Sequence, residues 1–571
     1  MFSIDFKPRF FSTLKSYNKE TFAADAMAGL IVGIVALPLA IAFAIASNPA
    51  EGVPPISPER GIITAIVAGL LISVFGGSKV QIGGPTGAFI PIICGIIGTY
   101  GFDGLCIATF MAGIFLILLG VCRLGSIIKF IPYPIVIGFT SGIAVTIFTT
   151  QVKELLGLSY QGGADDFIGK WSLYFQNLNT IDVWSAMIGI LSIVIIVFTP
   201  KFSKKIPGSL VAIIVMTIAG VLLKEYAGVT SIGTIGDRFG DIKAEIPSTV
   251  NFSAVTFDTI KGLLSPAFTI AILGAIESLL SAAVADGAIS DHHNSNTELI
   301  GQGLANLASP LFGGIPATGA IARTMTNINN GGRSPIAGVI HAIVLLIIFI
   351  CLMPIAKYIP MACLAGVLVV VSYNMSGWRS FLAQTKNPKS DVAVLLVTFF
   401  LTVIFDLTIA IEVGIVLACL LFMRRIASAS EVKVISDEID PNNESDMQHV
   451  QNDEHLIIPE GVEVYEINGP FFFGAGNKFE ELMGSLGDRP KVRVIRMRRV
   501  PFVDSTGIHN LTNLCEMSQK EGIKVVLSGV NPQVHKSLEK SGFYTLLGQD
   551  NICDNINAAM EKANQILAES K

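Results

Sequence analysis

Long apolar segments separated by short polar loops fill the first three quarters of the chain. A helix needs roughly 20 predominantly apolar residues to cross a bilayer, and most of these segments approach that length. The pattern therefore predicts an α-helical polytopic membrane protein with about 14 transmembrane segments, near residues 26–47, 60–76, 86–98, 103–122, 131–150, 181–199, 207–224, 261–284, 297–312, 319–330, 335–355, 359–374, 390–406 and 408–423.

Composition supports this interpretation and narrows the function classes. The 571 residues are 51% hydrophobic and only 15% charged, with a mean hydropathy of +0.63, which is too apolar for a soluble globular protein. The net charge of −5 and the absence of a basic stripe argue against a nucleic-acid partner. The eight cysteines have no metal-ligand spacing, and no nucleophile–base arrangement is recognisable. We expect neither a metal nor a cofactor, and no catalytic residue of an enzyme.

Two distant stretches repeat one motif. Phe75-Gly76-Gly77 precedes Pro85-Thr86-Gly87-Ala88, and Phe312-Gly313-Gly314 precedes Pro316-Ala317-Thr318-Gly319-Ala320, with Gly319 lying 319 − 87 = 232 residues after Gly87. The motifs open the third and tenth apolar segments, both short. Fourteen segments divide into seven and seven, and an odd-numbered repeat inverts the second half. Short apolar segments broken at matching places in two halves are typical of the midplane binding site of a secondary transporter.

The broken segments also predict which ligand binds there. A helix that begins near the membrane midplane directs unpaired N–H groups and about half a positive charge at the site, which favours an anion. The alternative is that the glycines only permit close helix packing. The residues expected to line the site are Phe43 on the first segment, which follows the helix-breaking Pro38, then Thr86, Gly87 and Ala88, and Thr318, Gly319 and Ala320.

Two ionisable residues inside apolar segments are the strongest further candidates. A charge within a span costs at least about 2.5 kcal/mol, so such residues usually face a cavity and carry function. Arg323 lies four residues after Gly319 and is expected to attract the anion. Glu277 lies within the apolar run 263–284, and its neutralisation beside an anion would couple transport to a proton or a sodium ion. The alternative is an ion pair between Arg323 and Glu277 without coupling. We expect structural roles for Asp25, Glu298, His341, Asp391 and Glu412.

Charge in the loops predicts the orientation and the domain boundaries. Lysine and arginine cluster in alternate short loops, which places both termini in the cytoplasm. The predicted domains are an N-terminal segment (1–24), a transmembrane anion-transport domain (25–430), an acidic linker (431–455) and a cytoplasmic domain (456–571). In the last domain, strand-like runs alternate with helical patterns, which predicts a small α/β fold.

The order of these motifs resembles the SulP anion transporter family. The resemblance covers nearly the whole chain and rests on both Thr-Gly-Ala motifs, Leu37–Ala44, Gly274–Leu279 and Asp504-Ser505-Thr506-Gly507. It implies a 7+7 inverted-repeat fold with core and gate subdomains, and an elevator-like motion. The C-terminal part is similar to a STAS domain. From the resemblance we also expect a homodimer in a bacterial inner membrane.

Family patterns sharpen several expectations. Sodium-coupled bicarbonate members carry Asp at the position of Glu277, whereas Glu is common in proton-coupled members. Many sulfate permeases have Gln at the position of Leu39, so the pattern favours proton-coupled uptake of C4-dicarboxylate-type anions. Sodium-coupled bicarbonate or sulfate transport stays open. Two further alternatives also stay open: a nucleobase permease, and an anion-binding membrane sensor that signals through the STAS-like domain.

Ser505 matches a serine that is phosphorylated in anti-sigma-factor antagonists. The motif can also simply cap a helix.

Overall fold

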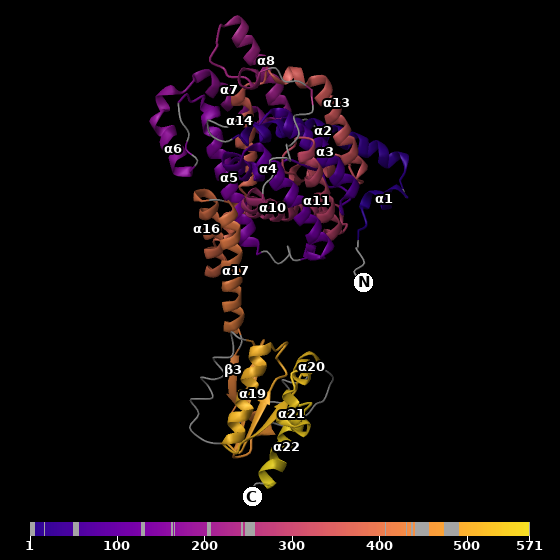
Figure 1. Cartoon of the computed structure of the whole chain (residues 1–571), viewed down its shortest axis with the longest axis vertical. Coiled ribbons are helices and arrows are strands. Elements are labelled where there is room, and N and C mark those ends of the chain that lie inside the picture. Colours follow the sequence, from indigo (N-terminus) through magenta and orange to yellow (C-terminus); the bar gives the residue numbers. More distant parts are fainter. Residues whose placement is uncertain are drawn as a thin grey trace. The chain divides into compact units, whose positions relative to one another are not determined.

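The chain forms two compact units, Met1–Val416 and Leu417–Lys571, which are described separately. The structure is a computed structural model (Figure 1). It describes residues 6–15, 17–48, 56–126, 132–160, 164, 166–202, 207–240, 244–245, 257–405, 407–429, 431–435, 438–439, 456–472 and 490–569.

Every predicted apolar segment lies on a helix, and all but the last of these helices, α17 (Leu407–Ala429), fall entirely within the first unit. The third and fourth segments lie in α4, whose backbone breaks at Gly101 (φ 69°, ψ −176°), a conformation that suits a residue without a Cβ. Among the described residues, nine helices are long and apolar enough to cross a membrane. The helices that contain the predicted segments, whether or not they are among these nine, are α2 (Lys19–Ala46), α3 (Pro58–Phe75), α4 (Ile90–Val121), α5 (Tyr133–Leu156), α7 (Val183–Phe202), α8 (Gly208–Tyr226), α10 (Phe257–Ile289), α11 (Ser295–Leu311), α12 (Ile321–Asn329), α13 (Ile336–Ala356), α14 (Met361–Met375), α16 (Lys389–Ile404) and α17 (Leu407–Ala429).

Short elements connect these helices. They are α1 (Arg9–Leu14), η1 (Gly87–Phe89), α6 (Phe167–Gln176), η3 (Leu178–Thr180), α9 (Ile235–Phe239) and α15 (Trp378–Gln384). The N-terminus of α9 carries a capping box in which Thr234 and Asp237 satisfy each other's backbone N–H groups.

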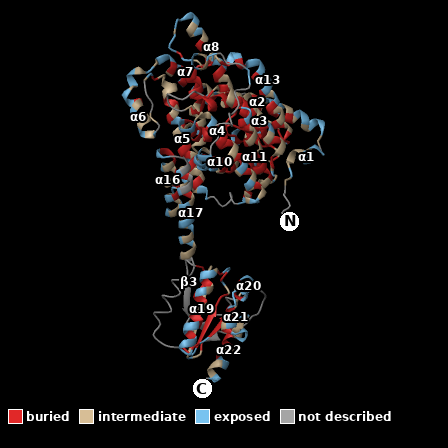
Figure 2. Cartoon of the chain, viewed as in Figure 1, coloured by how far each residue is buried: buried red, intermediate tan, exposed pale blue. Residues whose placement is uncertain are grey.

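The long helices pack in two groups, as expected for core and gate subdomains. In one group α4 packs against α10 and α11, α3 packs against α11 and α13, and α2 packs against α13. In the other, α5 packs against α14 and α16, and α7 packs against α8 and α14. Buried residues concentrate where the helices meet, whereas exposed apolar side chains cover the outer surfaces (Figure 2). An apolar outer surface is what contact with lipid requires.

A two-stranded antiparallel sheet joins the two repeats inside the first unit. Strand β1 (Gly83–Gly84) pairs with β2 (Thr318–Gly319), with Gly83 opposite Gly319 and Gly84 opposite Thr318. All four residues are buried. The pairing satisfies backbone groups that the broken helices leave inside the membrane-spanning unit, where water is scarce.

The second unit contains a five-stranded sheet in the order β3-β6-β7-β8-β9. Strand β3 is antiparallel to β6, and the remaining pairs are parallel. The strands are β3 (Glu431–Ile435), β6 (Val462–Asn468), β7 (Val492–Arg496), β8 (Lys524–Ser528) and β9 (Ile552–Cys553), and the helices are α19 (Ser505–Lys520), α20 (Pro532–Lys540), α21 (Phe543–Leu547) and α22 (Ile556–Glu569), with η6 (Gln549–Asn551). Apolar clusters on both faces of the sheet form the core, which is the predicted α/β arrangement.

The segment predicted as a linker contains regular structure. It begins with β3, and β4 (Glu438–Ile439) pairs with β5 (Leu456–Ile457). The run Val432-Lys433-Val434-Ile435 is apolar enough to add an edge strand, although the acidic residues beyond it suggested a linker. The rest of that segment, 440–455, lies outside the described residues.

Candidate binding site

The two broken helices begin at different points of the repeated motif. The first begins at Gly87 with η1, after the N-cap Thr86. The second begins at Ile321, after the N-cap Ala320. We expected both to begin within Thr-Gly-Ala. The second starts later because Thr318 and Gly319 are used as a strand. The backbone N–H groups at the two helix starts donate no hydrogen bond to any described residue. These groups belong to Gly87, Ala88, Ile321 and Ala322.

The start of the first broken helix faces three side chains. A Cβ added at Gly87 would lie 3.3 Å from Phe43 Cε1, 3.2 Å from Ile147 Cδ1 and 3.3 Å from Met375 Sδ. These side chains come from α2, α5 and α14, so the helix start lies where the two helix groups meet. Phe43 is 5% exposed. Gly87 and Phe43 are therefore neighbours, as the predicted site required.

Glu277 contacts the same helix start from α10. The hydroxyl of Thr86 donates a hydrogen bond to Glu277 Oε2 over 3.1 Å. Both side chains are partly accessible, although most of their neighbours are buried. Their accessibility leaves the carboxylate in reach of a small ion.

The second Thr-Gly-Ala motif is held by the protein itself. Thr318 Oγ1 lies 2.6 Å from Ser278 Oγ and donates to the carbonyl of Gly274 over 2.9 Å. The N–H of Gly319 donates to Ser278 Oγ over 3.1 Å, and the N–H of Ala320 donates to the carbonyl of Ile82 over 2.9 Å. These three residues therefore fix the frame of the site, and the free N–H groups belong to the residues that follow them.

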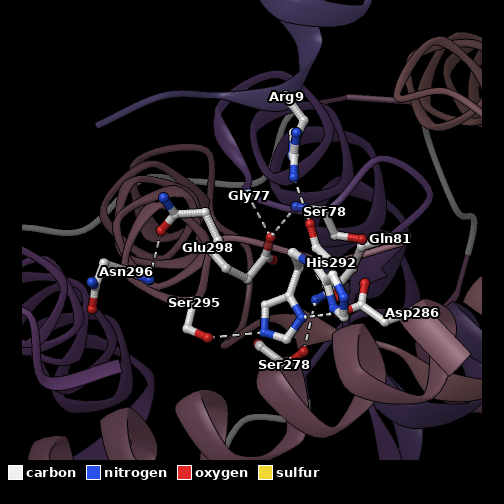
Figure 3. Close-up of polar contacts among 12 residues, drawn as sticks. Arg9, Gly77, Ser78, Gln81, Ser278, Asp286, His292, Ser295, Asn296 and Glu298 are labelled. Carbon is white, nitrogen blue, oxygen red and sulfur yellow. Dashed lines mark hydrogen bonds and ion pairs between the residues drawn. The ribbon is translucent and has the colours of Figure 1, made fainter. Parts of the chain in front are cut away.

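A buried glutamine side chain leaves no room for a Cβ at Gly319. A Cβ at this position would lie 1.8 Å from Gln81 Nε2. Gln81 is 3% exposed and its amide donates to the carbonyl of Ser278 over 3.2 Å, a contact drawn in Figure 3. The glycine thus makes room for a glutamine side chain, which the sequence did not reveal.

Arg323 reaches from the second repeat to the first. Its Nη2 donates to the carbonyl of Pro85 over 2.6 Å, and its side chain is among the largest that are fully buried. Nη1 has no hydrogen-bond partner and lies beside Gly84, where an added Cβ would be 2.3 Å away. In the described residues no carboxylate forms an ion pair with Arg323, and Glu277 has none with a cation. The positive charge of Arg323 is therefore not paired with a carboxylate from any part of the chain that the structure describes.

Asp25, one of the residues expected to be structural, has the contacts that such a role requires. The carboxylate of Asp25 accepts from the backbone N–H groups of Arg333 (2.8 Å) and Ser334 (3.2 Å) and from the hydroxyl of Tyr17 (2.8 Å). His341 is fully buried. The side chain of Glu412 lies outside the described residues.

Ser505 lies in the second unit, as the exposed first residue of α19. Asp504 caps this helix, because its carboxylate accepts a hydrogen bond of 2.7 Å from the N–H of Gly507. This is the capping role considered above. Phosphorylation of Ser505 stays a prediction.

Sequence reasoning missed several residues that shape the site. Ile147 and Met375 come from helices far away in the sequence, and no local pattern identifies them. Ser278 had a detectable signal, since it is a small polar residue next to Glu277 in an apolar run. Gln81 lies two residues before Gly83, between the apolar residues Val80 and Ile82, and is another polar residue in an apolar setting.

Comparisons with known proteins agree with this architecture. Residues 22–398 match the sulfate permease family, and residues 455–559 match the STAS domain. A Bacillus subtilis protein named "Putative sulfate transporter YvdB" is 39% identical over 96% of this chain and 98% of its own length. The bicarbonate transporter BicA of Picosynechococcus is 31% identical, with 94% of each chain covered.

A solved structure of the murine anion transporter Slc26a9 in an inward-facing state has the same fold. The two structures align with a TM-score of 0.82 at 19% identity, over 97% of this chain and 93% of the murine one. The family match covers more than half of the chain, and its members are transporters rather than enzymes. The chain therefore belongs to the sulfate permease family of anion transporters and carries a C-terminal STAS domain.

Proposed function

We propose that this protein is a secondary active transporter that takes up a C4-dicarboxylate-type anion together with a proton. The single observation that carries the proposal is the contact between Thr86 and Glu277 at a helix start with free N–H groups. An anion bound at this helix start and the ionised carboxylate of Glu277 would repel each other, so the carboxylate must be neutralised when the anion binds. A proton on Glu277 would meet that condition.

The anion would bind at the two helix starts. The N–H groups of Gly87 and Ala88 on one side, and of Ile321 and Ala322 on the other, are free to donate to it. Phe43 would contact its apolar part, and the charge of Arg323 would attract it through the layer formed by β1 and β2. Thr86, Ala88, Thr318, Gly319 and Ala320 would set the geometry of this pocket.

Transport would follow an elevator-like motion. The side chains around Gly87 come from both helix groups, so movement of one group relative to the other would open or close the space beside this helix start. A bound anion would travel with the group that carries both helix starts. The protein would act as a homodimer in the inner membrane, with both termini in the cytoplasm.

A second candidate is sodium-coupled transport of bicarbonate or sulfate. The names of the relatives favour it, because one relative is a bicarbonate transporter and another is named for sulfate. In this case Glu277 would coordinate sodium or remain charged, and the anion would be smaller.

Uptake into proteoliposomes tests these proposals. Labelled succinate, fumarate, aspartate, bicarbonate and sulfate are compared under a proton gradient and, separately, under a sodium gradient. Accumulation of a dicarboxylate driven by the proton gradient supports the first proposal, and accumulation of bicarbonate or sulfate driven by sodium supports the second. Binding of an anion without accumulation would instead indicate a sensor that signals through its STAS domain.

A further inference from the structure

The loops that lead into the two broken helices are held by matching polar contacts. The first loop contains Gly77 and Ser78 and follows α3. The second contains Gly313, Gly314 and Ile315 and follows α11. Each loop is contacted by the beginning of the helix that precedes the other loop. This arrangement requires α3 and α11 to run antiparallel side by side.

The contact at the first loop is made by a carboxylate. Glu298, the fourth residue of α11, is fully buried. Its Oε2 accepts hydrogen bonds from the N–H groups of Gly77 (2.7 Å) and Ser78 (3.0 Å), as Figure 3 shows. Its Oε1 accepts from Gln302 Nε2 over 2.8 Å. No cation forms an ion pair with Glu298 in the described part of the chain, and the hydrogen bonds to its carboxylate come from backbone and amide donors.

The contact at the second loop is made by a cation and a hydroxyl. Arg60, the third residue of α3, donates from Nη1 to the carbonyl of Gly313 over 2.9 Å. One turn later, Thr64 Oγ1 accepts from the N–H of Ile315 over 2.8 Å and donates to the carbonyl of Arg60 over 2.6 Å. The inverted repeat thus uses opposite charges for the same task. An acid binds N–H groups at one loop, and a base binds a carbonyl at the other.

The glycines of both loops fit this arrangement. A Cβ at Gly77 would lie 2.1 Å from the carbonyl oxygen of Asn294, and a Cβ at Gly314 would lie 2.7 Å from Thr64 Oγ1. The loops therefore lie directly against the opposing helices. Any displacement of Glu298 or Thr64 changes the path of a loop that ends at β1 or β2, a few residues before a helix start.

We propose that Glu298 and the pair Arg60 and Thr64 are positioning residues for anion binding. They act through the loops and fix where the N–H groups of the two broken helices point. This inference rests on the proposed function, because it assigns these residues to the geometry of that same site. Small displacements of a preorganised donor are costly for a bound anion.

The test compares isosteric and conservative variants in the full-length protein. Thr64→Val removes the acceptor for Ile315 with little change in volume, and Thr64→Ser retains it. Glu298→Gln removes the charge at constant size. Lys79→Gln is the matched control, because it breaks only the partly exposed ion pair with Asp291 (2.7 Å) near the first loop. Dissociation constants are measured for two anions that the parent transports, and thermal stability is measured alongside.

We expect Thr64→Val and Glu298→Gln to raise the dissociation constant of the folded protein for the anion about threefold to thirtyfold. This is the range for loss of a hydrogen bond to a charged or buried group. The ratio of the two dissociation constants should also change, while Thr64→Ser and Lys79→Gln bind like the parent. Folded variants that bind both anions as the parent does, at lower thermal stability, would overturn the proposal. If Glu298→Gln does not fold, Thr64→Val decides; if neither folds, these residues determine the fold and the proposal is wrong. A parent that binds no anion contradicts the proposed function instead.

Discussion

The hydroxyl of Thr86 donates a hydrogen bond to the carboxylate of Glu277 across 191 residues of sequence. The contact links the N-cap of the first broken helix to the middle of α10. Under the proposed function, an anion at this helix start would lie close to the carboxylate, and the protonation of Glu277 and the occupancy of the site should depend on each other.

Replacing Glu277 with glutamine tests this dependence. Glu277→Gln mimics the neutral carboxyl group, so it should still bind the anion but lose accumulation driven by a proton gradient. For the parent, uptake should increase as the external pH falls, because protonation on the outside favours entry of the anion. The measurement is uptake at fixed membrane potential and varied external pH. Proton-driven accumulation that survives in Glu277→Gln, or accumulation in the parent driven by sodium alone, would contradict proton coupling.

Filling the space beside Gly87 should block the site without disrupting the fold. Its neighbours are the ends of the side chains of Phe43, Ile147 and Met375, which can move. Gly87→Val should therefore weaken anion binding at least about tenfold, the scale of one lost charge-assisted hydrogen bond. Gly95→Ala is the control, since no atom lies within 4 Å of its added Cβ. Parent-like affinity in well-folded Gly87→Val would place the anion elsewhere.

Gly319 should behave differently from Gly87. Its Cβ would overlap the Gln81 amide, so Gly319→Ala should lower the thermal stability and the yield of folded protein. Truncating the glutamine removes the overlap, and Gly319→Ala combined with Gln81→Ala should recover part of the stability. A double variant no more stable than Gly319→Ala would show that another contact requires the glycine.

Arg323 should strengthen anion binding through its charge. Arg323→Ala should weaken binding by about 1–3 kcal/mol, the range for interactions with a charged group. Arg323→Lys keeps the charge and should recover part of this affinity, although it loses the shape of the contact with Pro85. Titration of both variants with the labelled anion measures the effect. Unchanged affinity at reduced thermal stability would indicate that Arg323 only joins the two repeats.

Truncation tests whether the membrane unit contains the complete site. The helix starts and Glu277 all lie within the first compact unit. A chain that ends after Arg425 should insert and bind the anion, even if its turnover falls. A well-folded truncated protein without binding would mean that the second unit contributes to the site.

The sequence predicted the membrane helices well because lipid imposes a strong, local constraint on them. It also predicted that Gly87 lies near Phe43 and that the two Thr-Gly-Ala motifs lie together, which agrees with the structure; the binding site itself stays a prediction. It did not reveal that Thr318 and Gly319 form a strand, because a two-residue strand has no periodic pattern and its partner lies in the other repeat. Nor did it identify Ile147 and Met375, since apolar residues that line a site look the same as those that face lipid.

The roles of charged residues were harder to predict for a physical reason. Glu298 was expected to have a structural role, and its position in the first turn of α11 is compatible with one. Its hydrogen bonds to Gly77 and Ser78 depend on the crossing of two helices, which no sequence pattern specifies. Likewise, Arg323 stands out in the sequence as a charged residue within an apolar segment. Its partner cannot be predicted in this way, because the carbonyl of Pro85 is a backbone group that every residue carries.

The pairing of β1 with β2 also bears on how the protein is made. The backbone of Gly83 and Gly84 enters the bilayer early in synthesis, and its partners Thr318 and Gly319 emerge only after more than two hundred further residues. Until then, these polar groups have no strand to pair with, and unsatisfied backbone groups are costly in lipid. The nascent first repeat must therefore remain shielded by its neighbouring helices, by water or by the insertion machinery until the second repeat arrives. A chain that ends before Thr318 would leave the backbone of Gly83 and Gly84 without its partner strand.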